Sequence, residues 1–144
     1  MTQTLLLADL AATEALAVRV AGLVRPGDAI LLEGPLGAGK SAFARAFLRA
    51  AAGDAALEVP SPSYTLVQSY ETRVGAVHHF DLWRLDGPGA VVELGWDELA
   101  ADIVLVEWPD RLGALWPERA LWIRLAMADG DARVAVVDGW GERL

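Results

Sequence analysis

One stretch, GPLGAGKS at residues 34–41, decides the fold of this 144-residue chain. It matches the pattern Gly-x-x-x-x-Gly-Lys-Ser, which holds phosphate groups when it connects a strand to a helix. Glycines let the backbone turn tightly and point successive N–H groups inward, and the helix that follows adds unpaired N–H donors. We expect Lys40 to reach the β- and γ-phosphates of a nucleotide. The residues predicted to lie against the nucleotide are Leu36, Gly37, Ala38, Gly39, Lys40, Ser41 and Ala42.

The flanking sequence supplies the strand and the helix that this pattern requires. Residues 29–32 form a continuous apolar run, which is typical of a parallel strand buried on both faces. Residues 40–52 have helical periodicity, and Gly53 is suited to cap the helix. Lys40 is the only lysine among twelve basic residues. Its position in the loop therefore indicates a specific role.

The rest of the chain alternates short apolar runs with helical segments. Asp9 is a predicted N-cap for a helix that extends to residue 24, and a second, short helix is predicted at residues 90–99. Further strands are predicted at residues 5–7, 65–70, 74–80, 103–106, 121–125 and 133–137. This alternation predicts the α/β class, as a single P-loop NTPase-like domain over residues 1–144. We expect a mainly parallel sheet flanked by helices, with antiparallel strands toward the C-terminus.

Composition excludes several classes of function. The formal net charge of −8 disfavours direct binding to nucleic acid, which needs clustered basic residues. The chain has no cysteine and therefore no disulfide or thiolate metal site. It has no asparagine, so the Asn-Lys-x-Asp guanine reader of GTPases is absent. With no signal-like N-terminus and no apolar run of about 18 residues, we expect a cytoplasmic protein without a membrane association.

Two carboxylates are candidates to complete a Mg²⁺ site. Glu107 follows four apolar residues, and Asp81 follows the β-like residues 77–80. An acid at the carboxyl end of a strand lies beside the crevice where α/β sheets bind ligands. The residues alone leave open which acid contacts the metal. Adjacent His78 and His79 should point to opposite faces of their strand, so we interpret them as packing residues rather than metal ligands.

Four segments together resemble the bacterial TsaE (YjeE) family. They are GPLGAGKS at 34–41, SPSYT at 61–65, HFDLWR at 79–84 and VEWP at 106–109. Their order and spacing extend over nearly the whole chain, and the last two are more specific than the phosphate loop. The family supplies the ATPase of the machinery that makes N6-threonylcarbamoyladenosine in tRNA. The resemblance therefore implies an ATP- and Mg²⁺-dependent ATPase that works with TsaD and TsaB and meets tRNA only indirectly, through that complex.

The resemblance also implies roles for particular residues. Ser41 and Glu107 would hold Mg²⁺, while Asp81 would lie near the γ-phosphate or the attacking water. The residues expected to act in catalysis are therefore Lys40, Asp81 and Ser63, of which Asp81 or Ser63 would help to place the water. Since phosphoryl transfer needs mainly positioning and charge neutralisation, no covalent role is expected for any of them.

Other implied features lie around this centre. The loop at residues 61–64 would respond to the nucleotide as a switch, and Arg133 would approach the adenine together with residues 9–11. The chain departs from the family pattern at Ser41-Ala42, where Thr-Thr is usual, and at Ser63, where Thr is usual. Trp83 replaces a common tyrosine. A metal-binding hydroxyl survives these changes, and somewhat slower hydrolysis is expected.

Two other functions remain open on the sequence. A small-metabolite kinase would share the phosphate loop, although the chain has no Gly-Gly loop and no arginine-rich lid segment. A non-catalytic binding module would use ATP only to order a loop. No arginine stands out as an arginine finger, and a partner-supplied cation can be worth roughly 10³–10⁵ in rate. Weak ATPase activity is therefore expected for the isolated protein, with faster turnover in the complex.

Overall fold

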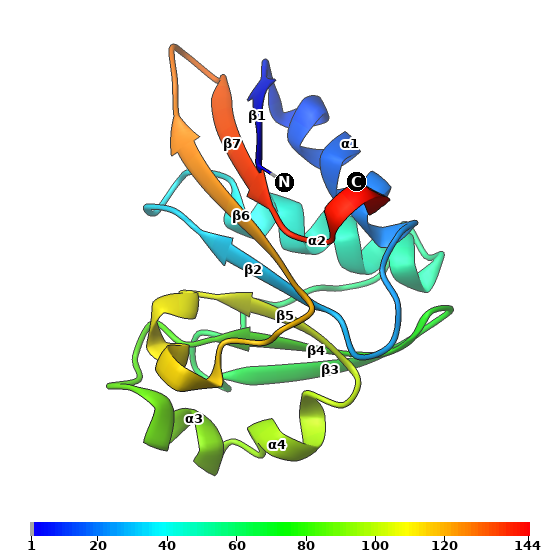
Figure 1. Cartoon of the computed structure of the whole chain (residues 1–144). Helices are drawn as coiled ribbons and strands as arrows, with labels where there is room; N and C mark the ends of the chain where they lie inside the picture. Colours follow the sequence, from blue (N-terminus) through cyan, green and yellow to red (C-terminus); the bar gives the residue numbers. More distant parts are fainter. Residues whose placement is uncertain (1) are drawn as a thin grey trace.

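In the computed structural model, which describes residues 2–144, the strands form one seven-stranded sheet (Figure 1). Their order across the sheet is β1-β7-β6-β2-β5-β4-β3. In chain order they are β1 (Thr2–Leu7), β2 (Ala29–Glu33), β3 (Val67–Thr72), β4 (Gly75–Asp81), β5 (Ile103–Glu107), β6 (Ala120–Met127) and β7 (Arg133–Asp138). The phosphate-loop strand β2 is therefore central, with β5 on one side and β6 on the other.

The predicted α/β class is confirmed, with parallel strands in the middle of the sheet. β6, β2, β5 and β4 run parallel, whereas β7 is antiparallel to both β6 and β1. The antiparallel β3 at the other edge was not predicted. It pairs with β4 as a hairpin in which Thr72 lies opposite Gly75. Alternation along a strand does not reveal its direction, so the sequence left this pairing undetermined.

Helices cover both faces of the sheet (Figure 1). α1 (Leu10–Ala21) and α2 (Lys40–Ala52) pack on one face, while α3 (Pro88–Glu93), α4 (Trp96–Leu99) and the 3₁₀ segment η1 (Pro109–Leu115) pack on the other. The predicted cap of α1 is confirmed, since the Asp9 carboxylate accepts a hydrogen bond from the Ala12 N–H at 2.9 Å. Among the described residues, none of the helices has the length and apolar character needed to cross a bilayer.

The prediction of one helix at residues 90–99 was wrong, because the structure has two short helices there. α3 already begins at Pro88. Proline is favoured in the first turn of a helix, because the N–H group that it lacks would have no partner there. Gly95 then has φ +89°, a left-handed conformation that ends the first helix and precedes the second. α1 likewise stops at Ala21 rather than residue 24, before a turn that leads to β2.

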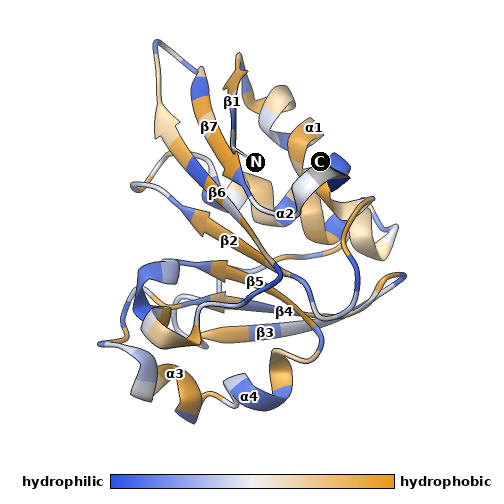
Figure 2. Ribbon diagram, in the orientation of Figure 1, coloured by the Kyte–Doolittle hydropathy of each residue, from blue (hydrophilic) through white to orange (hydrophobic). Residues whose placement is uncertain are grey.

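Two apolar clusters, one on each face, fix the elements that carry the phosphate loop. On the α1/α2 face, Phe43 and Phe47 of α2 are fully buried one helical turn apart. Full burial of such a side chain stabilises the fold by about 1.5–3 kcal/mol. On the other face, Trp96 packs edge-on against Phe80 at 5.1 Å between ring centroids. Figure 2 shows β2 coloured as hydrophobic along most of its length, as expected for a strand covered on both sides.

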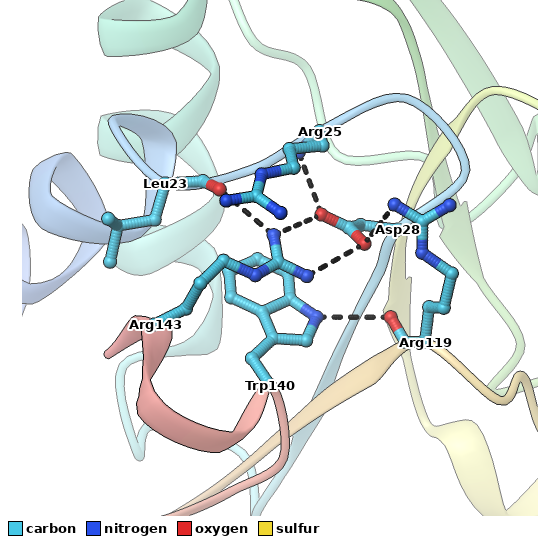
Figure 3. Close-up of polar contacts among 6 residues, drawn as sticks. All are labelled: Leu23, Arg25, Asp28, Arg119, Trp140 and Arg143. Carbon is cyan, nitrogen blue, oxygen red and sulfur yellow. Dashed lines mark hydrogen bonds and ion pairs between the residues drawn. The ribbon is translucent and has the colours of Figure 1, made fainter.

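A buried ion cluster fixes the start of β2 and the C-terminal segment η2 (Gly141–Arg143), as Figure 3 shows. Asp28 is 0% exposed and accepts hydrogen bonds from Arg143 at 2.6 and 3.1 Å. Arg119 lies 3.2 Å from the same carboxylate, and the Arg25 N–H donates to it at 2.7 Å. The Trp140 indole N–H donates to the Arg119 carbonyl at 3.0 Å. These contacts hold the end of β2 that lies opposite the phosphate loop.

Candidate nucleotide-binding site

The loop between β2 and α2 has the backbone shape that an anion-binding nest requires. Gly34, Gly37 and Gly39 all have positive φ, at +154°, +84° and +107°. At Gly34 a Cβ atom would lie 2.5 Å from the Leu125 carbonyl oxygen, so no larger residue fits without displacing backbone. Gly39 precedes α2 without a side-chain cap, which leaves the first N–H groups of the helix free for a ligand. Ala38 is fully buried beneath the loop.

Lys40 is held inside the site by two contacts. Its Nζ donates to the Gly34 carbonyl at 2.5 Å and lies 3.7 Å from the centre of the Trp108 indole ring. The residue is only 5% exposed. Burial lowers the pKa of Lys40 below its ordinary value of 10.5, and the nearby carboxylates of Glu107 and Asp81 oppose that shift. The ammonium thus shares the cleft with both predicted acids.

Asp81 and Glu107 lie side by side at the carboxyl ends of adjacent parallel strands. They are paired residues in the register of β4 and β5, and each is more than nine-tenths buried. Ser63 donates to Asp81 Oδ2 at 3.1 Å, and the Trp83 N–H donates to Oδ1 at 3.0 Å. The loop at residues 61–64 therefore contacts the acid that was predicted to lie near the γ-phosphate.

His79 has a role that the sequence did not reveal. Its Nε2 lies 2.8 Å from Glu107 Oε2, and both residues are buried. His78 points to the other face and bonds with Ser69 Oγ at 2.7 Å and Asp102 Oδ2 at 2.9 Å. The predicted opposite orientation of the two imidazoles is correct, but His79 contacts a site carboxylate. The available signal was the strand period of two, which places His79 on the same face as Asp81.

The predicted residues converge on one cleft of about 340 Å³. It is lined by Leu36, Gly37, Gly39, Lys40, Ser41, Ala42, Ser61, Ser63, Asp81, Glu107 and Trp108. All residues predicted for catalysis, for Mg²⁺ or for the phosphate loop share it, except the buried Ala38. Arg133 and residues 9–11, predicted to lie near the adenine, line an adjoining cavity.

That adjoining cavity has a volume of about 420 Å³ and shares Gly39 with the cleft. It is lined by Asp9, Leu10, Ala11, Thr13, Gly39, Asp131 and Arg133. Arg133 also donates to the Gly37 carbonyl at 3.1 Å, which connects β7 to the phosphate loop. The two segments predicted to lie near the adenine, residues 9–11 and Arg133, are thus next to each other. Thr13 and Asp131 are lining residues that the sequence did not indicate.

The cleft has the donor set that Mg²⁺ uses together with a nucleotide. No group of three or more His, Cys, Asp or Glu side chains able to hold a metal by itself occurs among the described residues. Mg²⁺ is commonly held by one or two carboxylates together with substrate phosphates and water. The Ser41 hydroxyl and the Glu107 and Asp81 carboxylates, all lining the same cleft, fit that arrangement.

The sheet order, the glycine loop before α2 and the acids at the strand ends define an α/β protein of the P-loop NTPase-like class. Within that class, the family model described as "Threonylcarbamoyl adenosine biosynthesis protein TsaE" matches residues 7–135. The chain belongs to the TsaE family.

Individual relatives agree with this assignment. The chain is 32% identical to the tRNA threonylcarbamoyladenosine biosynthesis protein TsaE of Rickettsia felis, over 87% of this chain and 73% of that protein. It is also 32% identical to the Bacillus subtilis protein of the same name, over 91% and 82% of the two chains. Among solved structures, the crystal structure of Bacillus subtilis YdiB is similar, with a TM-score of 0.80 and 27% identity. That similarity covers 99% of this chain and 88% of YdiB.

Proposed function

We propose that this chain binds ATP with Mg²⁺ and hydrolyses it, as the nucleotide-dependent component of tRNA threonylcarbamoyladenosine biosynthesis. The observation that carries this proposal is the convergence of the glycine loop, Lys40, Ser41, Asp81 and Glu107 on one cleft. The family's role in this tRNA modification is established by the family match and supplies the biological context.

The residues would divide the work of phosphoryl transfer as follows. The loop amides and Lys40 hold the phosphates, and Ser41 with Glu107 holds Mg²⁺, which supplies charge neutralisation when it is bound. Asp81, oriented by the Ser63 hydroxyl and the Trp83 N–H, would place the water. The cavity beside Arg133 would take the base and ribose. Lys40 has three N–H donors, so it would keep its hydrogen bond to the Gly34 carbonyl while it turns from the Trp108 ring toward phosphate oxygens.

The partners in this proposal are TsaD and TsaB, with tRNA reached only through the complex. The formal net charge of −8 supports the indirect contact, because phosphate backbones repel an acidic surface. A cytoplasmic location is part of the same proposal, since the pathway acts on tRNA.

Arg84 is the arginine nearest in sequence to Asp81, but it does not line the phosphate cleft. It is exposed and donates to the Ser63 carbonyl at 3.4 Å. Because Arg84 does not supply a cation to the cleft, a cation supplied by a partner would raise turnover.

The test is ATP turnover by the wild type and by Lys40→Ala, each with and without TsaB and TsaD. We expect slow hydrolysis by the isolated wild type, an increase with the partners, and no activity above background for Lys40→Ala. Equal rates with and without partners would contradict the partner-dependent part. Transfer of labelled γ-phosphate to a small acceptor would indicate a kinase instead. Partner binding that needs ATP but no hydrolysis would indicate a non-catalytic module.

A further inference from the structure

The two histidines of β4 differ in how their ring nitrogens are satisfied. Both nitrogens of His78 have partners, namely Ser69 and Asp102. Among the described residues, His79 has a partner at Nε2, which is Glu107, and none at its buried Nδ1. Glu107 is therefore the polar group that orients the His79 ring.

This contact constrains the carboxylate that was predicted to hold Mg²⁺. Because an ionised carboxylate only accepts hydrogen bonds, Nε2 is the donor in this contact. Oε2 of Glu107 is thereby occupied at 2.8 Å. The other oxygen, Oε1, is left for a ligand. Carboxylates that bind metals are commonly oriented by such a hydrogen bond from a neighbouring side chain.

A small cavity beside Glu107 provides space into which its carboxylate could otherwise turn. It has a volume of about 130 Å³ and is lined in part by His79, Glu107, Ser41 and Arg45. Without the imidazole, the Glu107 carboxylate would have space to rotate away from the nucleotide cleft. Arg45 lines the same cavity and would offer it a competing charged partner.

We propose that His79 is a positioning residue, which holds Glu107 Oε2 and so keeps this carboxylate in the orientation that would serve a Mg²⁺ ion bound with the nucleotide. This inference rests on the proposed function, because it concerns the metal of the same site. It assigns His79 no contact with the nucleotide and no proton transfer.

The test compares His79→Leu, which removes the donor, with His79→Gln, whose amide N–H can still reach Glu107. His78→Leu is the matched control on the same strand. ATP binding is measured by calorimetry in EDTA and across a Mg²⁺ titration, on folded protein checked by thermal unfolding. We expect His79→Leu to raise the Mg²⁺ concentration needed for half-maximal enhancement of ATP binding by about 10–100-fold. ATP affinity in EDTA should stay within about threefold of wild type, because the loop and Lys40 are unchanged.

The conservative variant and the control make the proposal refutable. His79→Gln should lie within about threefold of the wild type in its Mg²⁺ requirement, and His78→Leu should not change it. An unaltered Mg²⁺ requirement in His79→Leu, or an equal loss of affinity with and without Mg²⁺, would overturn the positioning role. A Mg²⁺ requirement that is as high in His79→Gln as in His79→Leu would overturn it as well.

A second measurement covers the case in which His79→Leu does not fold. His79→Ala also removes the donor, and on a Glu107→Gln background it should change the Mg²⁺ requirement by less than about twofold, because the residue acts through Glu107. A further loss on that background would refute the proposal. The failure of the proposed function is distinguishable, since the wild type would then bind no nucleotide in either buffer.

Discussion

Replacing Lys40 by methionine removes the ammonium and keeps most of the side chain's apolar stem. In the structure this ammonium donates to the Gly34 carbonyl at 2.5 Å and lies 3.7 Å from the Trp108 ring centre. An ammonium has three N–H donors, so one can keep the bond to Gly34 while the other two reach phosphate oxygens, and only the contact with Trp108 is given up. The contribution of Lys40 to the free energy of ATP binding is therefore a difference between the bound and free states. It is smaller than the phosphate contacts alone would give.

The magnitude follows from these contacts. Two hydrogen bonds from Lys40 to β- and γ-phosphate oxygens would contribute about 1.5–3 kcal/mol each. The hydrogen bond to Gly34 is common to the free and bound states and cancels, whereas loss of the cation–π contact with Trp108 offsets about 0.5–2 kcal/mol. A net of about 3 kcal/mol remains. ATP affinity should therefore fall about 150-fold in Lys40→Met.

Calorimetric titration with ATP and with AMP, both in Mg²⁺, measures this effect. AMP lacks the β- and γ-phosphates, so its affinity should change by less than about threefold. Arg49→Met is the matched control, because it removes a positive charge from the same helix. Its guanidinium bonds with the Leu57 carbonyl, outside the cleft. ATP affinity that stays within about threefold of wild type in Lys40→Met, or an equal loss for AMP, would refute the reasoning.

The same variant predicts a pH-dependent difference in stability. Burial lowers the pKa of Lys40 in the folded protein below 10.5, so the unfolded chain binds more protons at this residue between the folded pKa and 10.5. The free energy of unfolding of the wild type, relative to Lys40→Met, should therefore rise with pH in that window and level off above it. Urea denaturation of both proteins from pH 7 to 11 measures the difference. A relative stability that falls with pH would contradict the assignment.

Three further predictions concern the loop, the C-terminal segment and the switch loop. Gly34→Ala would place a Cβ atom 2.5 Å from the Leu125 carbonyl, and we expect a loss of about 1–3 kcal/mol in urea denaturation; an unchanged midpoint would contradict this. Arg143→Met leaves the buried Asp28 with fewer partners and should cost about 3 kcal/mol by the same assay, whereas a loss below about 1 kcal/mol would show that the cluster of Figure 3 contributes little. Ser63→Ala removes a hydrogen bond worth about 1.5 kcal/mol from Asp81, and kcat for ATP should fall about tenfold with binding unaffected. A change in affinity instead of kcat would argue against a role in placing the water.

Local pattern was enough to predict the elements that carry the phosphate loop. The apolar run at residues 29–32, the helix at 40–52 and the cap at Gly53 are all present, with Gly53 in the left-handed conformation at φ +66°. Each of these features depends on residues that are close together in the sequence. The acids Asp81 and Glu107 could be placed for a similar reason, since parallel strands bring their carboxyl ends to one edge of the sheet.

Features that depend on distant residues could not be predicted. The bond between His79 and Glu107 joins residues 28 positions apart, and the Arg133 contact with Gly37 joins residues 96 apart. The break at Gly95 was missed because periodicity continues through it, and only the backbone conformation separates the two helices. The sheet edge at β3 depends on hairpin pairing rather than on the composition of the strand.

The arrangement of charges in the cleft leads to one last consequence for binding. Among the residues that the structure describes, Lys40 is the only cationic side chain lining the cleft, and Asp81 and Glu107 are both within it. Because two carboxylates oppose one ammonium, the cleft favours a divalent cation and disfavours a triphosphate that arrives without one. ATP should therefore bind at least about tenfold more tightly with Mg²⁺ than in EDTA, and Glu107→Gln should reduce that ratio by raising affinity in EDTA while lowering it in Mg²⁺. Calorimetry in both buffers measures the ratio, with Asp97→Asn, an exposed acid of α4 outside the cleft lining, as the control. If affinity falls by the same factor in both buffers, the carboxylate stabilises the cleft without acting on the metal, and the electrostatic account of this site is wrong.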